Sequence, residues 1–237
     1  MKALSAVICV IAVSALTAQT PPAFETARVT GYPHDEGCRI QYLPDTFSVT
    51  YCSLSHIVGK LYSVRDFQIV DAPEWFHDAD GYNIDGKAAG PVDEDQLKLM
   101  ARQLFADRFH LKVHRETRQM LVYALVVSGN GPRQNAKDNG QPRGSGYTWS
   151  DFFNGVERVR GLNVSMSTLA AGLAVDRPVI DKTNFSGAID FDLRYAGGTS
   201  PPSIFSAMPE QLGLVLRPET DPVEVLVIDH VEKLSEN

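Results

Sequence analysis

Residues 93–127 read DEDQLKLMARQLFADRFHLKVHRETRQMLVYALVV, and the rest of the chain repeats their plan. Apolar residues recur at helical spacing from Leu97 to Phe105, and acidic residues precede them, where a helix exposes unpaired N–H groups. Apolar and polar residues then alternate over 109–114, and an apolar run follows over 120–127. The stretch therefore predicts a helix and two strands, with a turn at 115–119 that contains Glu116.

The order helix, strand, strand occurs in four segments, at 54–88, 93–127, 165–195 and 203–229. The second and fourth segments align at a constant offset of 103 residues, which places Glu116 with Glu219 and Thr117 with Thr220 at equivalent turns. This pattern predicts an α+β fold of repeated helix-strand-strand units, which form two antiparallel or mixed sheets with helices packed on one face. We expect an N-terminal half at 19–128 and a C-terminal half at 161–237.

The segment 129–160 between these halves is rich in Gly, Pro and Asn and is expected to form a flexible loop. It ends in an aromatic cluster that includes Trp149, Phe152 and Phe153 together with Tyr147. Two interpretations are open for this cluster. The favoured one is a short helix that docks on the fold, and the alternative is an exposed contact surface.

The first 18 residues have the features of a secretory signal peptide. Lys2 is followed by an apolar run from Ala3 to Leu16 and then by small residues. We place cleavage after Ala18, and a cut after Ala15 is the alternative. Because no other segment approaches the ~20 apolar residues of a spanning helix, the sequence predicts a secreted or periplasmic protein without a transmembrane segment after cleavage.

The net charge and the cysteines give further evidence about the partners and the compartment of the protein. Removal of the signal peptide leaves 21 basic and 29 acidic residues, a net charge of −8, which argues against nucleic acid as a partner. Cys38 and Cys52 lie symmetrically about Asp45 in an expected hairpin, so a disulfide can join them in an oxidising compartment. The alternative is a pair of buried free thiols in a hairpin of different register.

No established catalytic or cofactor motif occurs in the sequence. His110 and His114 lie on an expected strand, where four residues separate them by ~13 Å, too far for one metal ion. The phosphate-binding glycine loops and the serine elbow of hydrolases are also missing. We therefore assign no catalytic residue, no metal site and no cofactor. The weak candidates for a hydrolase acting on peptide or glycan are Glu116, Glu219, His110 and Asp181.

Several motifs in a fixed order resemble a known family. They are Trp75 after Pro73, YNIDGKA at 82–88, RFHL at 108–111, HRET at 114–117, YALVV at 123–127, RPVIDKT at 177–183, QLGL at 211–214, VIDHVE at 227–232 and SEN at 235–237. Together they resemble an uncharacterised, soil-associated family of secreted bacterial proteins, a domain of unknown function. Where that family has Gly after Asp-Lys-Thr, this chain has Asn184, which also tolerates a left-handed turn.

The resemblance implies a domain without an assigned activity. Its units are also similar, at the level of topology, to the short N-terminal modules of secretins and TonB-dependent receptors. Related domains attached to membrane metallopeptidases of the antibiotic-sensor type imply a sensory use. The leading hypothesis is a non-enzymatic binding or sensory module that takes an envelope protein or a cell-wall component. Its candidate contact residues are Trp75, Glu116, Trp149, Phe152, Phe153 and Glu219, and exposed sheet edges are expected to accept a partner strand.

Overall fold

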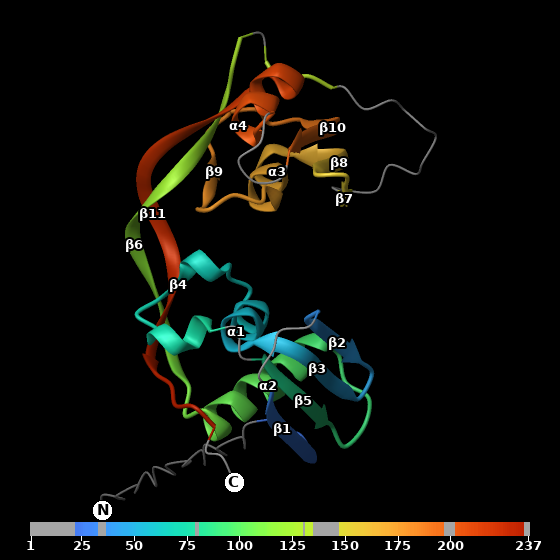
Figure 1. The fold of residues 1–237 in the computed structure, drawn as a ribbon, viewed down its shortest axis with the longest axis vertical. Coiled ribbons are helices and arrows are strands. Elements are labelled where there is room, and N and C mark those ends of the chain that lie inside the picture. The colour runs from blue at the N-terminus through green and yellow to red at the C-terminus, as the bar shows by residue number, and fades with distance from the viewer. Residues whose placement is uncertain are drawn as a thin grey trace, which may run out of the picture. The chain divides into compact units, whose positions relative to one another are not determined.

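The computed structural model describes residues 22–32, 37–78, 81–129, 131–134, 147–196 and 202–234 (Figure 1). Residues 1–18, the expected signal peptide, and residues 135–146 of the expected loop lie outside these ranges. The described residues form four α-helices and eleven strands in three sheets, where the sequence predicts two. The helices are α1 (Leu54–Tyr62), α2 (Glu94–Arg108), α3 (Met166–Gly172) and α4 (Ile204–Ala207).

The chain divides into two compact units, and neither unit is continuous in sequence. Unit 1 holds Met1–Leu61, Glu74–Leu111 and Val231–Asn237, and unit 2 holds Tyr62–Pro73 and Lys112–His230. The sequence predicts continuous halves at 19–128 and 161–237 instead. The difference arises because the C-terminal residues return to unit 1, where the N–H of Glu232 donates to the carbonyl of Phe109 at 2.7 Å.

Unit 1 is built on an antiparallel sheet with the strand order β1-β5-β3-β2. Its strands are β1 (Thr26–Tyr32), β2 (Arg39–Leu43), β3 (Thr46–Ser53) and β5 (Gly81–Lys87). Helix α2 begins as the acidic residues predict, because the side chain of Asp93 accepts a hydrogen bond from the N–H of Gln96. Phe47, Ile84 and Phe105 are fully buried in this unit.

A disulfide joins Cys38 to Cys52, with an S–S distance of 2.08 Å, which confirms the predicted pairing. The hairpin register differs by one residue from the symmetric arrangement about Asp45, since Leu43 stands opposite Thr46. The bond still forms because β3 is irregular between Val49 and Cys52, where it pairs with β5.

Unit 2 contains a three-stranded antiparallel sheet with the order β10-β8-β7. Its strands are β7 (Tyr147–Phe153), β8 (Val156–Ser165) and β10 (Ala188–Ala196). The sequence predicts a flexible loop over 129–160, but residues 147–160 form β7, a two-residue turn and the first half of β8. The core beneath this sheet includes Phe191, Leu193 and Leu169, all nearly inaccessible to solvent.

Two long strands, β6 (Lys112–Val127) and β11 (Leu214–His230), form an antiparallel ribbon in unit 2 (Figure 1). The short strands β4 (Ile69–Val70) and β9 (Val179–Asp181) flank it in parallel. The predicted turns around Glu116 and Glu219 are therefore wrong. The polar side chains at 115–119 alternate between exposed and half-buried, as in a strand. Strand β11 pairs with these residues, so their backbone hydrogen bonds form without a turn.

Left-handed backbone occurs at Asn184, with φ 54° after β9, as expected for the residue that replaces glycine there. In the described part of the chain, no helix is both long and apolar enough to cross a membrane.

Candidate functional site

The β7–β8 hairpin is the feature of unit 2 that most resembles a contact surface. Its two-residue turn consists of Asn154 and Gly155, both with positive φ, at 50° and 77°. This is the geometry of a type I′ turn, whose twist matches that of the flanking strands. Phe153 and Val156 pair on either side of the turn. The sequence therefore builds a defined hairpin tip rather than a loop.

Large apolar side chains are exposed at this tip. Phe152 is 64% exposed and Phe153 is 73% exposed, and Val156 beside them is 41% exposed. Because consecutive strand residues point to opposite faces, the two phenylalanines present apolar surface on both sides of the hairpin. Adjacent exposed aromatics of this kind are typical of interaction sites. The favoured interpretation of a docked short helix is wrong, and the exposed alternative describes these two residues.

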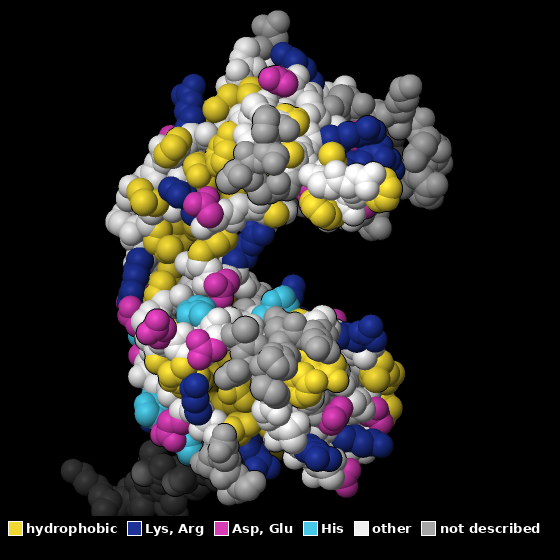
Figure 2. Space-filling model, in the orientation of Figure 1, with side chains coloured by type: hydrophobic (Ala, Val, Ile, Leu, Met, Phe, Trp, Pro, Cys, Tyr) yellow, Lys and Arg dark blue, Asp and Glu magenta, His cyan; other side chains and the backbone are white. Residues whose placement is uncertain are grey.

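Arginines gather on the sheet that carries the tip. Asp192 of β10 accepts hydrogen bonds from Arg158 of β8, one of them at 2.9 Å, and from Arg194 at 3.2 Å. The guanidinium of Arg160 lies 3.5 Å from the same carboxylate. Hydrogen bonds from Arg158 hold the pKa of Asp192 below its usual range. Figure 2 shows Lys and Arg side chains next to hydrophobic ones over β7 and β8.

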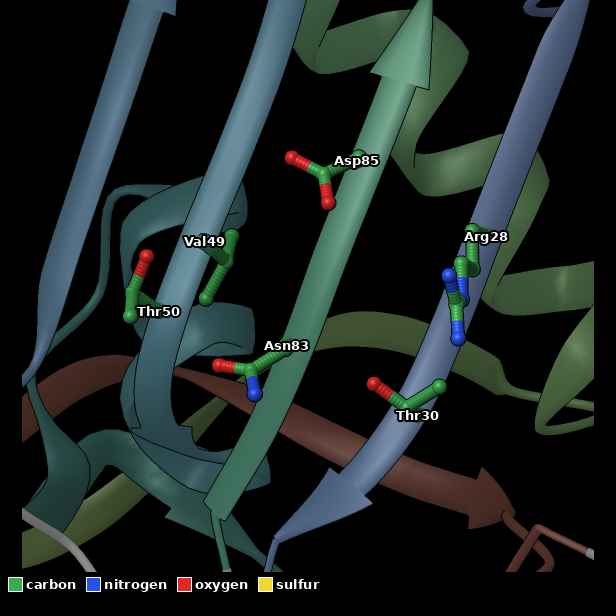
Figure 3. A pocket seen from close by; sticks show the side chains of 6 residues that line it. All are labelled: Arg28, Thr30, Val49, Thr50, Asn83 and Asp85. Carbon is green, nitrogen blue, oxygen red and sulfur yellow. The ribbon is translucent and has the colours of Figure 1, made fainter.

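A polar hollow of about 280 Å³ lies on the sheet of unit 1 (Figure 3). Arg28 and Asp85 line it from paired positions of β1 and β5. Asp85 accepts a hydrogen bond from Ser48 at 3.1 Å, and Asn83 accepts one from the N–H of Tyr51 at 2.9 Å. These bonds give Asp85 and Asn83 partners within the sheet, so both side chains have a structural role.

A network of charged side chains lies along the β6–β11 ribbon. Arg118 bonds both Glu116 and Asp71, and His114 bonds Asp229 at 2.9 Å. His114 also lies 3.8 Å from Glu116, which joins the two pairs. The hydrogen bond to Asp229 raises the pKa of His114, so protonation of the imidazole strengthens this network.

Comparison with known protein families places the chain in one of them. The family model described as "Protein of unknown function (DUF3738)" matches residues 55–231, most of the chain. The chain belongs to the DUF3738 family. Comparisons with curated proteins and with solved structures find no match. Membership confirms the resemblance to a domain of unknown function, while the likeness to secretin and TonB modules stays a prediction.

The candidate contact residues of this DUF3738 chain fall in separate places. Trp75 is half-buried in unit 1, where the ammonium of Lys233 lies 5.3 Å from its ring. Glu219 forms an ion pair with Lys182 at 2.6 Å in unit 2. Of the candidates whose side chains the structure describes, Phe152 and Phe153 are the exposed aromatic ones, and they lie on the two faces of the hairpin tip. The side chain of Trp149 lies outside the described residues, although its backbone belongs to β7.

The hydrolase candidates are not gathered into one site. Glu219 stands opposite Val122, six residues along β6 from Glu116, which corresponds to about 20 Å. The carboxylate of Asp181 accepts hydrogen bonds from the backbone and hydroxyl of Thr183. His110 pairs with Glu232 in unit 1. Across the described ranges, no three His, Cys, Asp or Glu side chains are grouped to hold a metal ion.

Sequence reasoning missed the hairpin and the arginines beside it. The Asn154-Gly155 dipeptide between Phe153 and Val156 is a strong hairpin signal, and it identifies the tip directly. No local sequence pattern predicts that Arg194 lies beside Arg158, because the two are 36 positions apart and become neighbours only through the pairing of β10 with β8.

Proposed function

We propose that the protein is exported and acts as a non-enzymatic binding module, with the β7–β8 hairpin tip as its contact surface. The proposal rests on the exposure of Phe152 and Phe153 at the end of β7, next to the Asn154-Gly155 turn. Burial of one phenylalanine side chain is worth roughly 1.5–3 kcal/mol, so the pair can supply much of the binding energy of a small interface. Its partner is a protein segment or another envelope component in the periplasm or outside the cell.

Export is supported by the signal-peptide pattern of the first 18 residues and by the disulfide. A bond between Cys38 and Cys52 persists in an oxidising compartment and is rare in a reducing one.

We also infer that the fold repeats itself. The order strand, strand, helix, strand, strand, helix, long strand runs from β2 to β6 and again from β7 to β11. Tyr51 in β3 and Asn163 in β8 both have left-handed backbone, at φ 55° and 52°. Their N–H groups donate to equivalent partners, Asn83 of β5 at 2.9 Å and Asp190 of β10 at 2.7 Å. A shared strand irregularity with a shared side-chain bond supports a common origin for the two segments.

The two copies differ in the surfaces that they expose. The sheet to which the first copy contributes carries the polar hollow and the disulfide, and the second copy carries the aromatic tip. This divergence supports a binding role for the second copy and a structural role for the first.

The proposal is tested by capture from an envelope extract with the mature chain. We expect the intact chain to retain a specific partner and the F152S/F153S variant to bind it at least about 100-fold more weakly, because two buried rings are lost. The matched control is L99S, which removes a 44% exposed leucine on α2 and should leave binding unchanged.

Equal capture by F152S/F153S and the intact chain would reject the hairpin as the contact surface. Retention of nothing by the intact chain would reject the binding role. Circular dichroism of each variant shows that the fold is kept, so loss of capture reports the contact.

A further inference from the structure

One edge of β6 pairs with β11, and the other pairs with β9 only at residues 123–125. We call the rest of this second edge the open edge of β6. The N–H of Tyr123 donates to Pro178 at 2.8 Å and the carbonyl of Leu125 accepts from Lys182 at 2.9 Å, so the backbone groups of these two residues face away from β11. Alternate residues of a strand direct their backbone groups to the same edge. The N–H and C=O groups of residues 113, 115, 117, 119 and 121 therefore face that edge, where the described residues supply no backbone partner.

The opposite edge of the ribbon is blocked. Pro218 of β11 stands opposite Tyr123 and Pro222 stands opposite Gln119. These positions face outward from β11, and proline has no N–H to offer a further strand. Prolines on an edge are a usual protection against strand addition, and β6 has none in its sixteen residues. The ribbon thus protects one edge and leaves the other able to pair.

We propose that a second copy of this chain pairs with the open edge of β6, antiparallel and about a two-fold axis at Thr117. In this register Val113 meets Leu121 of the second copy, and the two Thr117 residues face each other. Glu116 meets Arg118 across the new interface, twice because of the symmetry. Apolar, threonine and opposite-charge pairs are the cross-strand pairs that stabilise sheets.

The charges select this register over its neighbours. If the two-fold axis lay at position 116, Glu116 would stand opposite Glu116 of the second copy. If the axis lay at position 118, Arg118 would stand opposite Arg118. Like charges directly opposite one another destabilise a strand pair. The outward backbone groups also match, because residues 113, 115 and 117 meet 121, 119 and 117, all of which face the open edge.

The exposed surface of the ribbon fits the same partner. Leu121 is 63% exposed, the largest exposed fraction of any leucine in the described part of the chain. Thr117 and Gln119 on the same side are also exposed. Pairing covers Leu121 with Val113 of the second copy and adds a second Glu116 and Arg118 to an existing charge network.

The test places charges on the symmetry axis and measures mass by sedimentation. The intact chain should sediment as a dimer. T117E and T117K should each be monomers, because each places two like charges face to face. A one-to-one mixture of T117E with T117K should recover a dimer, which a merely destabilising effect on the fold cannot do. T220E is the matched control on β11 and should remain dimeric.

A monomeric intact chain at millimolar concentration would overturn the proposal. So would dimers of T117E or T117K alone, or a mixture of the two that stays monomeric while both variants retain native circular dichroism.

Discussion

Replacement of Phe191 by alanine should lower the free energy of unfolding of unit 2 by about 3–5 kcal/mol, the usual cost of deleting a buried aromatic ring. Phe191 is fully buried on β10. Its ring lies over Gly161 of β8, where an added Cβ would come within 2.3 Å of the ring. The ring therefore fills space that Gly161 keeps open, and its removal leaves a cavity in a closely packed core.

Denaturant unfolding followed by circular dichroism measures this effect. The control is F185A, which removes a 37% exposed ring and should change stability by less than about 1 kcal/mol. An equal effect of F191A and F185A would show that the core beneath the sheet is not packed as described.

Loss of the disulfide should have the next largest effect. The bond closes a loop with a sequence separation of 14, and restricting a loop of that length in the unfolded chain is worth about 3 kcal/mol. The C38A/C52A variant should therefore unfold in unit 1 at lower denaturant concentration than the intact chain.

Reducing agent supplies the control for this variant. It should destabilise the intact chain by a similar amount and leave C38A/C52A unchanged. A variant with the stability of the intact chain would mean that the bond does not restrain the unfolded state.

The sequence predicts the elements with local signals well. The acidic cap at Asp93 and the helical spacing from Leu97 to Phe105 correctly identify α2. The symmetric position of Cys38 and Cys52 leads to the disulfide, even though the register of the β2–β3 hairpin differs by one residue from the symmetric one. These features depend on neighbours in sequence, which is why a single chain reveals them.

The sequence fails where pairing over long distances decides the structure. Residues 114–119 resemble a turn because they are polar, yet β11 pairs with them from more than 100 residues away and extends β6 through them. The arginines around Asp192 gather for the same reason. The Asn154-Gly155 turn is a local signal, but the polar composition of the segment before it favours the prediction of a loop.

Direct contact between the tip of the β7–β8 hairpin and a partner is the step on which the proposed function depends. A photo-reactive phenylalanine analogue at position 153, with the same analogue at position 99 as a control, tests it in cells that export the protein. Our expectation is a cross-link to one defined partner from position 153 and none from position 99. Cross-links of equal yield from both positions, or none from position 153, would contradict it.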